Sequence, residues 1–156
     1  MIPRPTVPQL LQQCRRELMQ NVVPQISDET TLVALEQVQM ILDNCAYRAE
    51  HEITDLLTES AEMETMAIEA VEAHTDSMPR TRAALATLHR ERSDSLLTSK
   101  VGENYQLAAE TLSCAIEELM DLDDVARIDS AVAYLAGPRL DREAAGLTNW
   151  GFPGRG

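Results

Sequence analysis

Few residues in this chain have the types and spacing that a chemical function needs. A basic run lies at positions 80–92 and contains Arg80, Arg82, His89, Arg90 and Arg92. Arginine side chains match phosphate oxygens, so this run could bind a phosphate ligand or coenzyme A. The same arginines could instead pair with acidic residues of the chain itself. The sequence leaves both interpretations open.

The three histidines do not form a recognisable metal site. Di-iron sites in helical bundles need a glutamate three residues before a histidine on facing helices. The residues at that spacing before His51, His74 and His89 are Arg48, Val71 and Ala86. Motifs of zinc proteases, nucleotide-binding loops and serine hydrolases are absent as well. We therefore expect no catalytic residue, no metal, no cofactor and no enzymatic activity of the chain's own.

An acidic stretch between Pro24 and Pro79 dominates the chain. It runs from Gln25 to Met78 without a single glycine or proline. Residues 28–76 carry thirteen carboxylates against one base, Arg48, which gives 1 − 13 = −12 of the chain's net charge of −13. A run this free of helix breakers predicts one very long acidic helix, at about residues 28–75, with Ser27 or Asp28 as its N-cap.

The apolar residues of this stretch follow a spacing close to a heptad repeat. Three polar residues, Gln39, Ser60 and His74, fall on the same line. The spacing predicts a seam against other helices, and the helix either continues through or bends near 58–64, where the seam is polar. We favour continuity. The apolar seam residues are Leu32, Leu35, Leu42, Ala46, Ala49, Ile53, Leu56, Met63, Ala67 and Ala70.

Acidic side chains on this helix also stand next to each other at helical spacing. Glu59 and Glu62 are one such pair, and Glu69 and Glu72 are another. Like charges three or four residues apart destabilise an isolated helix. The pairs are either solvated or compensated by a basic surface. If the helix carrying Arg80, Arg82, Arg90 and Arg92 folds back, it supplies that surface; otherwise a second chain does.

The remaining segments predict an all-α fold, a bundle of four to five helices around the long one. Thr6 is a plausible N-cap for a first helix that ends at Pro24. A helix with its cap near Ser77 and Pro79 in its first turn carries the basic run. Residues 93–104 read as a loop, followed by helices at about 103–122 and from Asp123-Asp124 to Gly137, with one or two further turns at 139–147. We expect one helical domain over residues 1–147.

Residues 148–156 form a tail of glycine, proline and aromatic residues that we expect to be flexible. The tail holds the only tryptophan and the only phenylalanine of the chain, Trp150 and Phe152. Aromatic side chains dominate the energetics of protein interfaces. The tail is therefore either a frayed end or a docking anchor for a partner.

Composition limits the partners and the compartment. A pI of about 4.5 argues against binding to nucleic acid or to an anionic membrane, and no segment is apolar enough to span a bilayer. Cys14, Cys45 and Cys114 are far apart in sequence and lie in apolar helical patterns. We expect them to be buried thiols in a reducing cytoplasm.

The first third of the chain carries a family resemblance. Arg4-Pro5-Thr6 and Leu10-Leu11 open a helix that ends in Val22-Val23-Pro24, and Val38, Leu42, Ala46, Arg48 and Glu50 follow at helical spacing. This pattern, over residues 4–52, resembles a family of small helical bacterial proteins. Their genes stand beside aminoglycoside-phosphotransferase-like kinases and acyl-CoA dehydrogenases. One branch is similar to the small accessory subunit of a 4-hydroxyacyl-CoA kinase, in which the phosphotransferase-like partner does the chemistry.

Three hypotheses follow. The resemblance implies a non-catalytic accessory subunit that binds and supports a phosphotransferase-like kinase acting on acyl-CoA or a related small molecule. The heptad-like seam favours instead a self-assembling homo-oligomer with a structural or regulatory role. The basic run at 80–92 would suit a ligand-binding bundle. No catalytic residue carries over from the resemblance, which agrees with the absence of chemical motifs.

Overall fold

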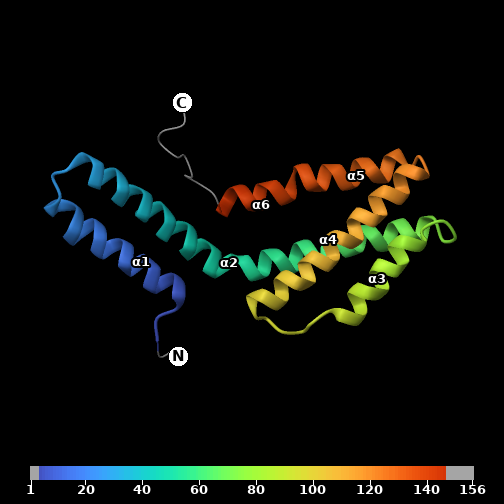
Figure 1. Cartoon of the computed structure of the whole chain (residues 1–156), viewed down its shortest axis with the longest axis horizontal. Helices are drawn as coiled ribbons and strands as arrows, with labels where there is room; N and C mark the ends of the chain where they lie inside the picture. Colours follow the sequence, from blue (N-terminus) through green and yellow to red (C-terminus); the bar gives the residue numbers. More distant parts are fainter. Residues whose placement is uncertain (1–3, 147–156) are drawn as a thin grey trace. The chain divides into compact units, whose positions relative to one another are not determined.

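The computed structural model describes residues 4–146, and these fold into α-helices without a strand (Figure 1). This confirms the predicted all-α class. No helix among them is long and apolar enough to cross a membrane. The helices are α1 (Val7–Glu17), α2 (Glu29–Ala73), α3 (Pro79–Glu91), α4 (Thr98–Asp121), α5 (Val125–Ala136) and α6 (Pro138–Gly146).

The long acidic helix is continuous, as predicted. α2 contains 45 residues, and Asp28 caps it by accepting hydrogen bonds from the backbone N–H and the hydroxyl of Thr31, at 2.8 and 2.6 Å. The polar position in its seam does not break it, because the Ser60 hydroxyl donates to the Leu56 carbonyl at 2.7 Å within the same helix. The buried hydroxyl of Ser60 is therefore satisfied within its own helix.

The chain forms two compact units, divided within α2 and again within α6. The described residues of the first unit are 4–52 and 143–146, and those of the second are 53–142. The expectation that residues 1–147 form one domain stays a prediction. Residues 148–156, which include the predicted flexible tail, lie outside the described residues.

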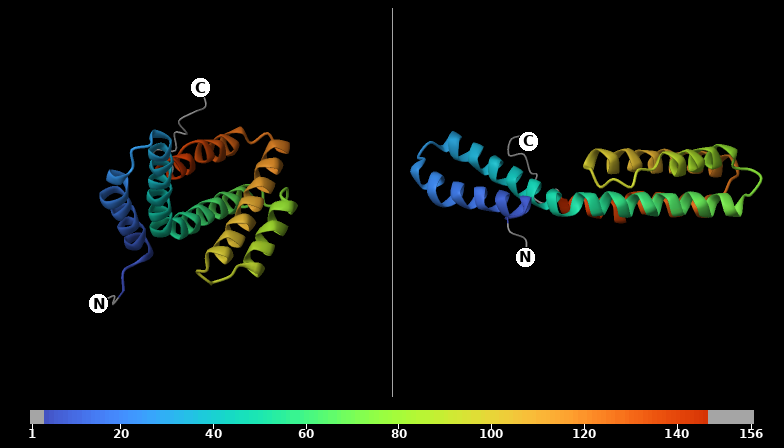
Figure 2. Two further views of the ribbon diagram at one scale, coloured as in Figure 1. Left: turned by 60° about the vertical axis from the view of Figure 1, so that its left-hand side comes forward. Right: turned by 90° about the horizontal axis from the view of Figure 1, so that it is seen from below.

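The first unit is a helical hairpin. α1 runs antiparallel to the beginning of α2 (Figures 1 and 2). Thr6 caps α1 in a reciprocal capping box with Gln9. A π-helical turn at Leu18–Val22 and a 3-10 turn at Val23–Gln25 complete the hairpin's first arm.

Little of this hairpin is enclosed. Ala46 is the one buried apolar residue among the unit's described residues. The seam residues Leu32, Leu35 and Leu42 are half-buried, and Ala49 is exposed, contrary to the prediction. The prediction of buried thiols is also wrong for Cys14 and Cys45, which are exposed. Two helices alone leave each helix with an open side, so apolar residues there stay in contact with solvent.

The second unit contains a packed core. Met63, Ala67 and Ala70 of α2 are buried against α3, α4 and α5, which confirms the seam in this half of the helix. α3 and α4 lie side by side (Figure 2). The core is aliphatic because the chain has few aromatic residues. Besides the α2 residues, it is built from Met78, Leu85, Leu88, Ala108, Leu112, Ala115, Leu119 and Ala131.

α4 begins earlier than the sequence indicates. The predicted loop at 93–104 is wrong for residues 98–104, which are helical. Val101 is fully buried in this first turn, and the Asn104 amide holds the connecting segment by accepting from the Ser93 N–H at 3.0 Å and donating to the Ser93 carbonyl at 2.7 Å. Tertiary burial of this turn outweighs the low helix propensity of Gly102.

The N-terminus of α3 is capped by a different helix. Met78 occupies the N-cap position without a side-chain hydrogen bond, so the predicted local cap near Ser77 is wrong. Glu118 of α4 accepts instead from the Arg80 N–H at 2.9 Å, the Thr81 N–H at 3.0 Å and the Thr81 hydroxyl at 2.7 Å. The carboxylate thus satisfies two of the free N–H groups at this helix end.

Candidate functional site

The acidic residues singled out from the sequence fall into two groups. Some pair with bases of the chain, and others are exposed without a basic partner among residues 4–146. Glu59 is buried, with 8% of its surface exposed, and its nearest cations are Arg142 at 3.7 Å and Arg139 at 3.8 Å. Glu62 accepts two hydrogen bonds from one Arg142 nitrogen, at 2.7 and 2.8 Å. These two glutamates therefore hold α6 against α2, and their predicted role in partner binding stays a prediction. We call Glu59, Glu62, Arg139 and Arg142 the α2–α6 cluster.

Two tyrosines adjoin this cluster. Tyr105 accepts a hydrogen bond from Arg139 at 3.2 Å. Burial raises the pKa of Tyr134 to about 12, and the neighbouring Glu62 carboxylate adds to this shift. The raised pKa keeps the Tyr134 phenol protonated near neutral pH.

The four arginines of α3 do not converge on one point. Arg80 pairs with Glu117 of α4 at 2.8 Å, and Arg92 pairs with Glu64 of α2. Arg90 pairs with its neighbour Glu91 at 2.9 Å, while Arg82 is exposed. Of the basic residues at 80–92, only Arg92 and His89 pair with the acidic helix α2. Both contact Glu64, and the His89 ring lies 2.7 Å from that carboxylate. Arg15, Arg139 and Arg142 also pair with acids of α2, at Asp43, Glu59 and Glu62 respectively. None of these three bases was singled out from the sequence, although the i, i+3 spacing of Arg139 and Arg142 matches that of Glu59 and Glu62.

The open acidic residues lie at the C-terminal end of α2. Glu69, Glu72 and Asp76 are exposed, and none of them has a basic partner among residues 4–146. The last turn of α2 contains no basic residue. Carboxylates at a helix C-terminus face the negative end of the helix dipole, which is unfavourable. We call these three residues the acidic end of α2. Trp150 and Phe152, the other predicted partner residues, lie outside the described residues.

A tertiary ion pair fixes the neighbouring turn. Asp124, the N-cap of α5, accepts from the His74 ring of α2 at 2.8 Å and from Arg127 at 2.6 Å. These hydrogen bonds, from His74 first and Arg127 second, lower the pKa of Asp124 from 3.8 to about 2. The sequence indicated the cap but not the histidine contact, since His74 and Asp124 are far apart in the chain.

Replacing Asp124 by asparagine is expected to remove a pH-dependent part of the stability. A carboxyl with a lowered pKa in the folded state stabilises the fold while it is ionised, above its ordinary pKa. This stabilisation decreases as the pH falls from about 4 through about 2. Thermal unfolding should therefore show a difference in Tm between wild type and Asp124→Asn that is constant above about pH 5 and shrinks below about pH 4. A difference unchanged down to about pH 2, or one matched by the exposed control Asp129→Asn, would contradict this assignment.

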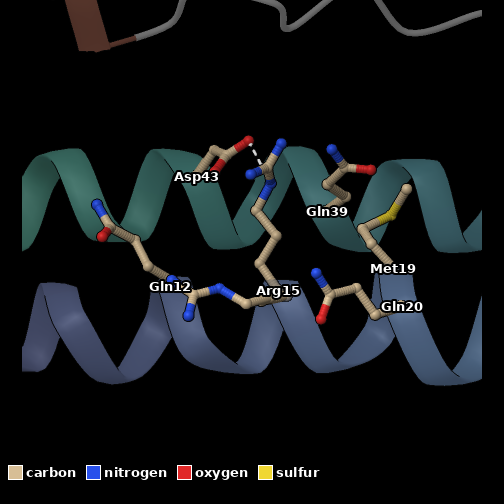
Figure 3. A pocket seen from close by; sticks show the side chains of 7 residues that line it. Gln12, Arg15, Met19, Gln20, Gln39 and Asp43 are labelled. Atoms are coloured by element: carbon tan, nitrogen blue, oxygen red, sulfur yellow. Dashed lines mark ion pairs between the residues drawn. The ribbon is translucent and has the colours of Figure 1, made fainter.

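The hairpin has a shallow polar groove of about 470 Å³ on one face (Figure 3). Arg15 projects from α1 across this groove and pairs with Asp43 of α2 at 2.9 Å. With its amide oxygen turned toward Arg15, Gln39 accepts from the guanidinium at 2.7 and 3.3 Å. Of the two arginines that line the groove, Arg15 is thus already neutralised. The lining residues are Gln12, Arg15, Arg16, Met19, Gln20, Gln39 and Asp43.

The described residues contain no candidate metal site. In the part of the chain that the structure describes, no group of three or more His, Cys, Asp or Glu side chains is arranged to hold a metal ion. The features without a partner among residues 4–146 include the acidic end of α2 and exposed apolar residues of the hairpin. Comparisons with family models, curated proteins and solved structures give no match to this chain.

Proposed function

We propose that this chain is a non-catalytic accessory subunit that binds and supports a phosphotransferase-like kinase acting on acyl-CoA or a related small molecule. The observation that carries the proposal is the acidic end of α2, where Glu69, Glu72 and Asp76 are exposed and have no basic partner within residues 4–146. The resemblance of residues 4–52 to a kinase accessory subunit supplies the class of partner. The chain is expected to act by binding, without catalysing a reaction.

The acidic end costs the free protein stability. Glu69 and Glu72 repel each other at i, i+3 and lie near the negative end of the helix dipole, and Asp76 adds a third negative charge in the turn after α2. A basic surface on a partner would remove both penalties on binding. Complementary charges of this kind raise the association rate and set specificity. The same residues should therefore weaken the free fold and strengthen the complex.

Neutralising the acidic end is expected to separate these two effects. In the triple variant Glu69→Gln, Glu72→Gln, Asp76→Asn, the free energy of unfolding should rise by about 0.3–1 kcal/mol, because the unfavourable charge interactions are gone. Binding to the kinase should weaken by about tenfold, mostly through a slower association rate. Chemical denaturation of the free chain and surface plasmon resonance with immobilised kinase measure the two quantities.

The triple variant Glu29→Gln, Glu36→Gln, Glu50→Gln is a matched control. It changes the net charge by the same amount at exposed positions in the N-terminal half of α2. It should leave kinase binding within about twofold, since charges distant from an interface are largely screened. Equal weakening of kinase binding by both variants would show that the net charge of α2, and not the position of its acidic residues, sets the affinity. No binding of the wild-type chain would remove the proposed function itself.

A further inference from the structure

The first part of α6 is attached to α2 by charged side chains. Arg142 donates two hydrogen bonds to Glu62, at 2.7 and 2.8 Å, and its charge lies 3.7 Å from Glu59. Arg139 lies 3.8 Å from Glu59 and donates to the Tyr105 hydroxyl at 3.2 Å. All of these residues belong to the second unit. Two arginines at i, i+3 thus meet two glutamates at i, i+3.

Apolar burial adds little to this contact. None of the α6 side chains that the structure describes, at 138–142 and 144, is buried. Leu140, the largest apolar side chain among them, is 48% exposed. The preceding helix α5, by contrast, buries Ala131 and packs Leu135 against the core. The position of α6 on α2 therefore depends mainly on charge, and a pair with access to solvent contributes little to stability.

The junction with α5 allows α6 to move by itself. Gly137 lies between the two helices with φ −118° and ψ −96°, outside the helical region. Pro138 has no N–H group, so the backbone hydrogen bond that would continue α5 at this position is missing. α6 also has only nine residues, and helices this short are not stable alone in water. α6 can therefore leave α2 without opening α5, and it loses its helical structure when it does.

We propose that α6 is a strap held by charge, which leaves α2 and unfolds locally while the rest of the second unit stays folded. Elements with few buried apolar contacts open in this way at a low cost in free energy. Release uncovers the Glu59 carboxylate, which is 8% exposed in the docked state, and the partner of Arg142, Glu62. Both glutamates are among the acids that the sequence predicts for partner binding. The strap therefore controls whether these two carboxylates are accessible.

Hydrogen exchange of the full chain at two salt concentrations tests how the strap is held. The hydrogen-bonded amides of α6, at 141–146, should exchange about threefold faster in about 500 mM NaCl than in about 20 mM NaCl, because salt screens the charges that attach α6. The amides in the middle of α4 should change by less than about twofold, since that helix is held by buried aliphatic side chains. They also report whether the unit as a whole stays folded.

Exchanging the charges of α6 and α2 tests which residues hold the strap. Arg142→Glu places a carboxylate beside Glu59 and Glu62, so the α6 amides should exchange at least about fivefold faster than in wild type. Adding Glu62→Arg restores a cation opposite the new carboxylate, and exchange should return to within about twofold of wild type. Arg90→Glu is the matched control, because it changes the net charge equally while Arg90 pairs only with residues of its own helix. It should leave exchange in α6 within about twofold of wild type.

Three results would overturn the proposal. Exchange in α6 that is no faster in higher salt, or no faster in Arg142→Glu, would mean that contacts other than ion pairs hold the helix. Exchange in α4 that rises by the same factor as in α6 would show that α6 opens only together with the core. Failure of the double exchange to restore protection would mean that Arg142 acts without Glu62. All three are measured on the free chain, so they are independent of kinase binding by the acidic end of α2.

Discussion

Replacing Glu118 by glutamine is expected to lower the free energy of unfolding by about 2–3 kcal/mol. Glu118 is 5% exposed and accepts three hydrogen bonds from the start of α3, two from backbone N–H groups and one from the Thr81 hydroxyl. Glutamine loses the charge and places an amide N–H₂ group where an acceptor is required. A buried donor left unsatisfied costs more than the hydrogen bond itself was worth.

The titration of Glu118 supports this role. Burial alone would raise its pKa, but the hydrogen bonds from Thr81 and from the Arg80 N–H, with the Arg80 charge, lower it overall. The stabilisation from the ionised carboxylate is therefore complete above its ordinary pKa of 4.5 and is lost as the pH falls below that value. The difference between wild type and Glu118→Gln should accordingly decrease in acid.

Glu117 provides the matched control for this variant. It precedes Glu118 in α4, but it is exposed and pairs only with the exposed Arg80. Exposed ion pairs contribute little, so Glu117→Gln should change the stability by no more than about 0.5 kcal/mol. Urea denaturation of both variants measures the difference. Equal stability of the two would show that the contact from α4 does not cap α3.

Replacing Arg142 by methionine is expected to cost about 1–2 kcal/mol and to loosen α6. The Arg142 side chain is 24% exposed and binds Glu62, while its charge also faces the buried Glu59. Methionine keeps the apolar stem but leaves Glu59 with Arg139 as its nearest cation, at 3.8 Å. A buried carboxylate that loses a counter-charge is destabilising, and partial solvent access reduces the cost here.

Hydrogen exchange measures the local effect of Arg142→Met. Amides of α6 within residues 138–142 should exchange several-fold faster, while those of α3 should change little, because the contact joins only α2 and α6. Arg90→Met is a suitable control, since Arg90 pairs only with residues of its own helix. Unchanged exchange in α6 would mean that apolar contacts, and not the α2–α6 cluster, hold this helix in place.

Local rules predicted the helices well where the chain itself carries the signal. The absence of glycine and proline between Pro24 and Pro79 predicted one long helix, and Asp28 caps it. Thr6 and Asp124 were likewise recognisable as caps. The start of α4 and the cap of α3 were not, because Val101 and Glu118 act through contacts with other helices. Such contacts depend on packing that no local pattern contains.

The partners of the charged residues were likewise not predictable from local sequence patterns. The sequence revealed an excess of acid on α2 and a basic run on α3, but not which helices become neighbours. Arg80 turns to α4, whereas Arg142, far along the chain, reaches Glu62. Among residues 4–146, the acids of α2 that remain unpaired include those of the acidic end. The sequence therefore predicted the size of the negative charge on α2. Which of its acidic residues stay unpaired became clear only from the ion pairs within the chain.

The proposed accessory role is tested most directly by the activity of a phosphotransferase-like kinase. Such a kinase, taken as the proposed partner, would be expressed alone and together with this chain, and its soluble yield and its turnover with acyl-CoA substrates would be measured. We expect the two proteins to co-purify, the chain alone to have no turnover, and the kinase to be more soluble and more active in the presence of the chain. Equal solubility and equal turnover of the kinase with and without the chain would contradict the proposed role.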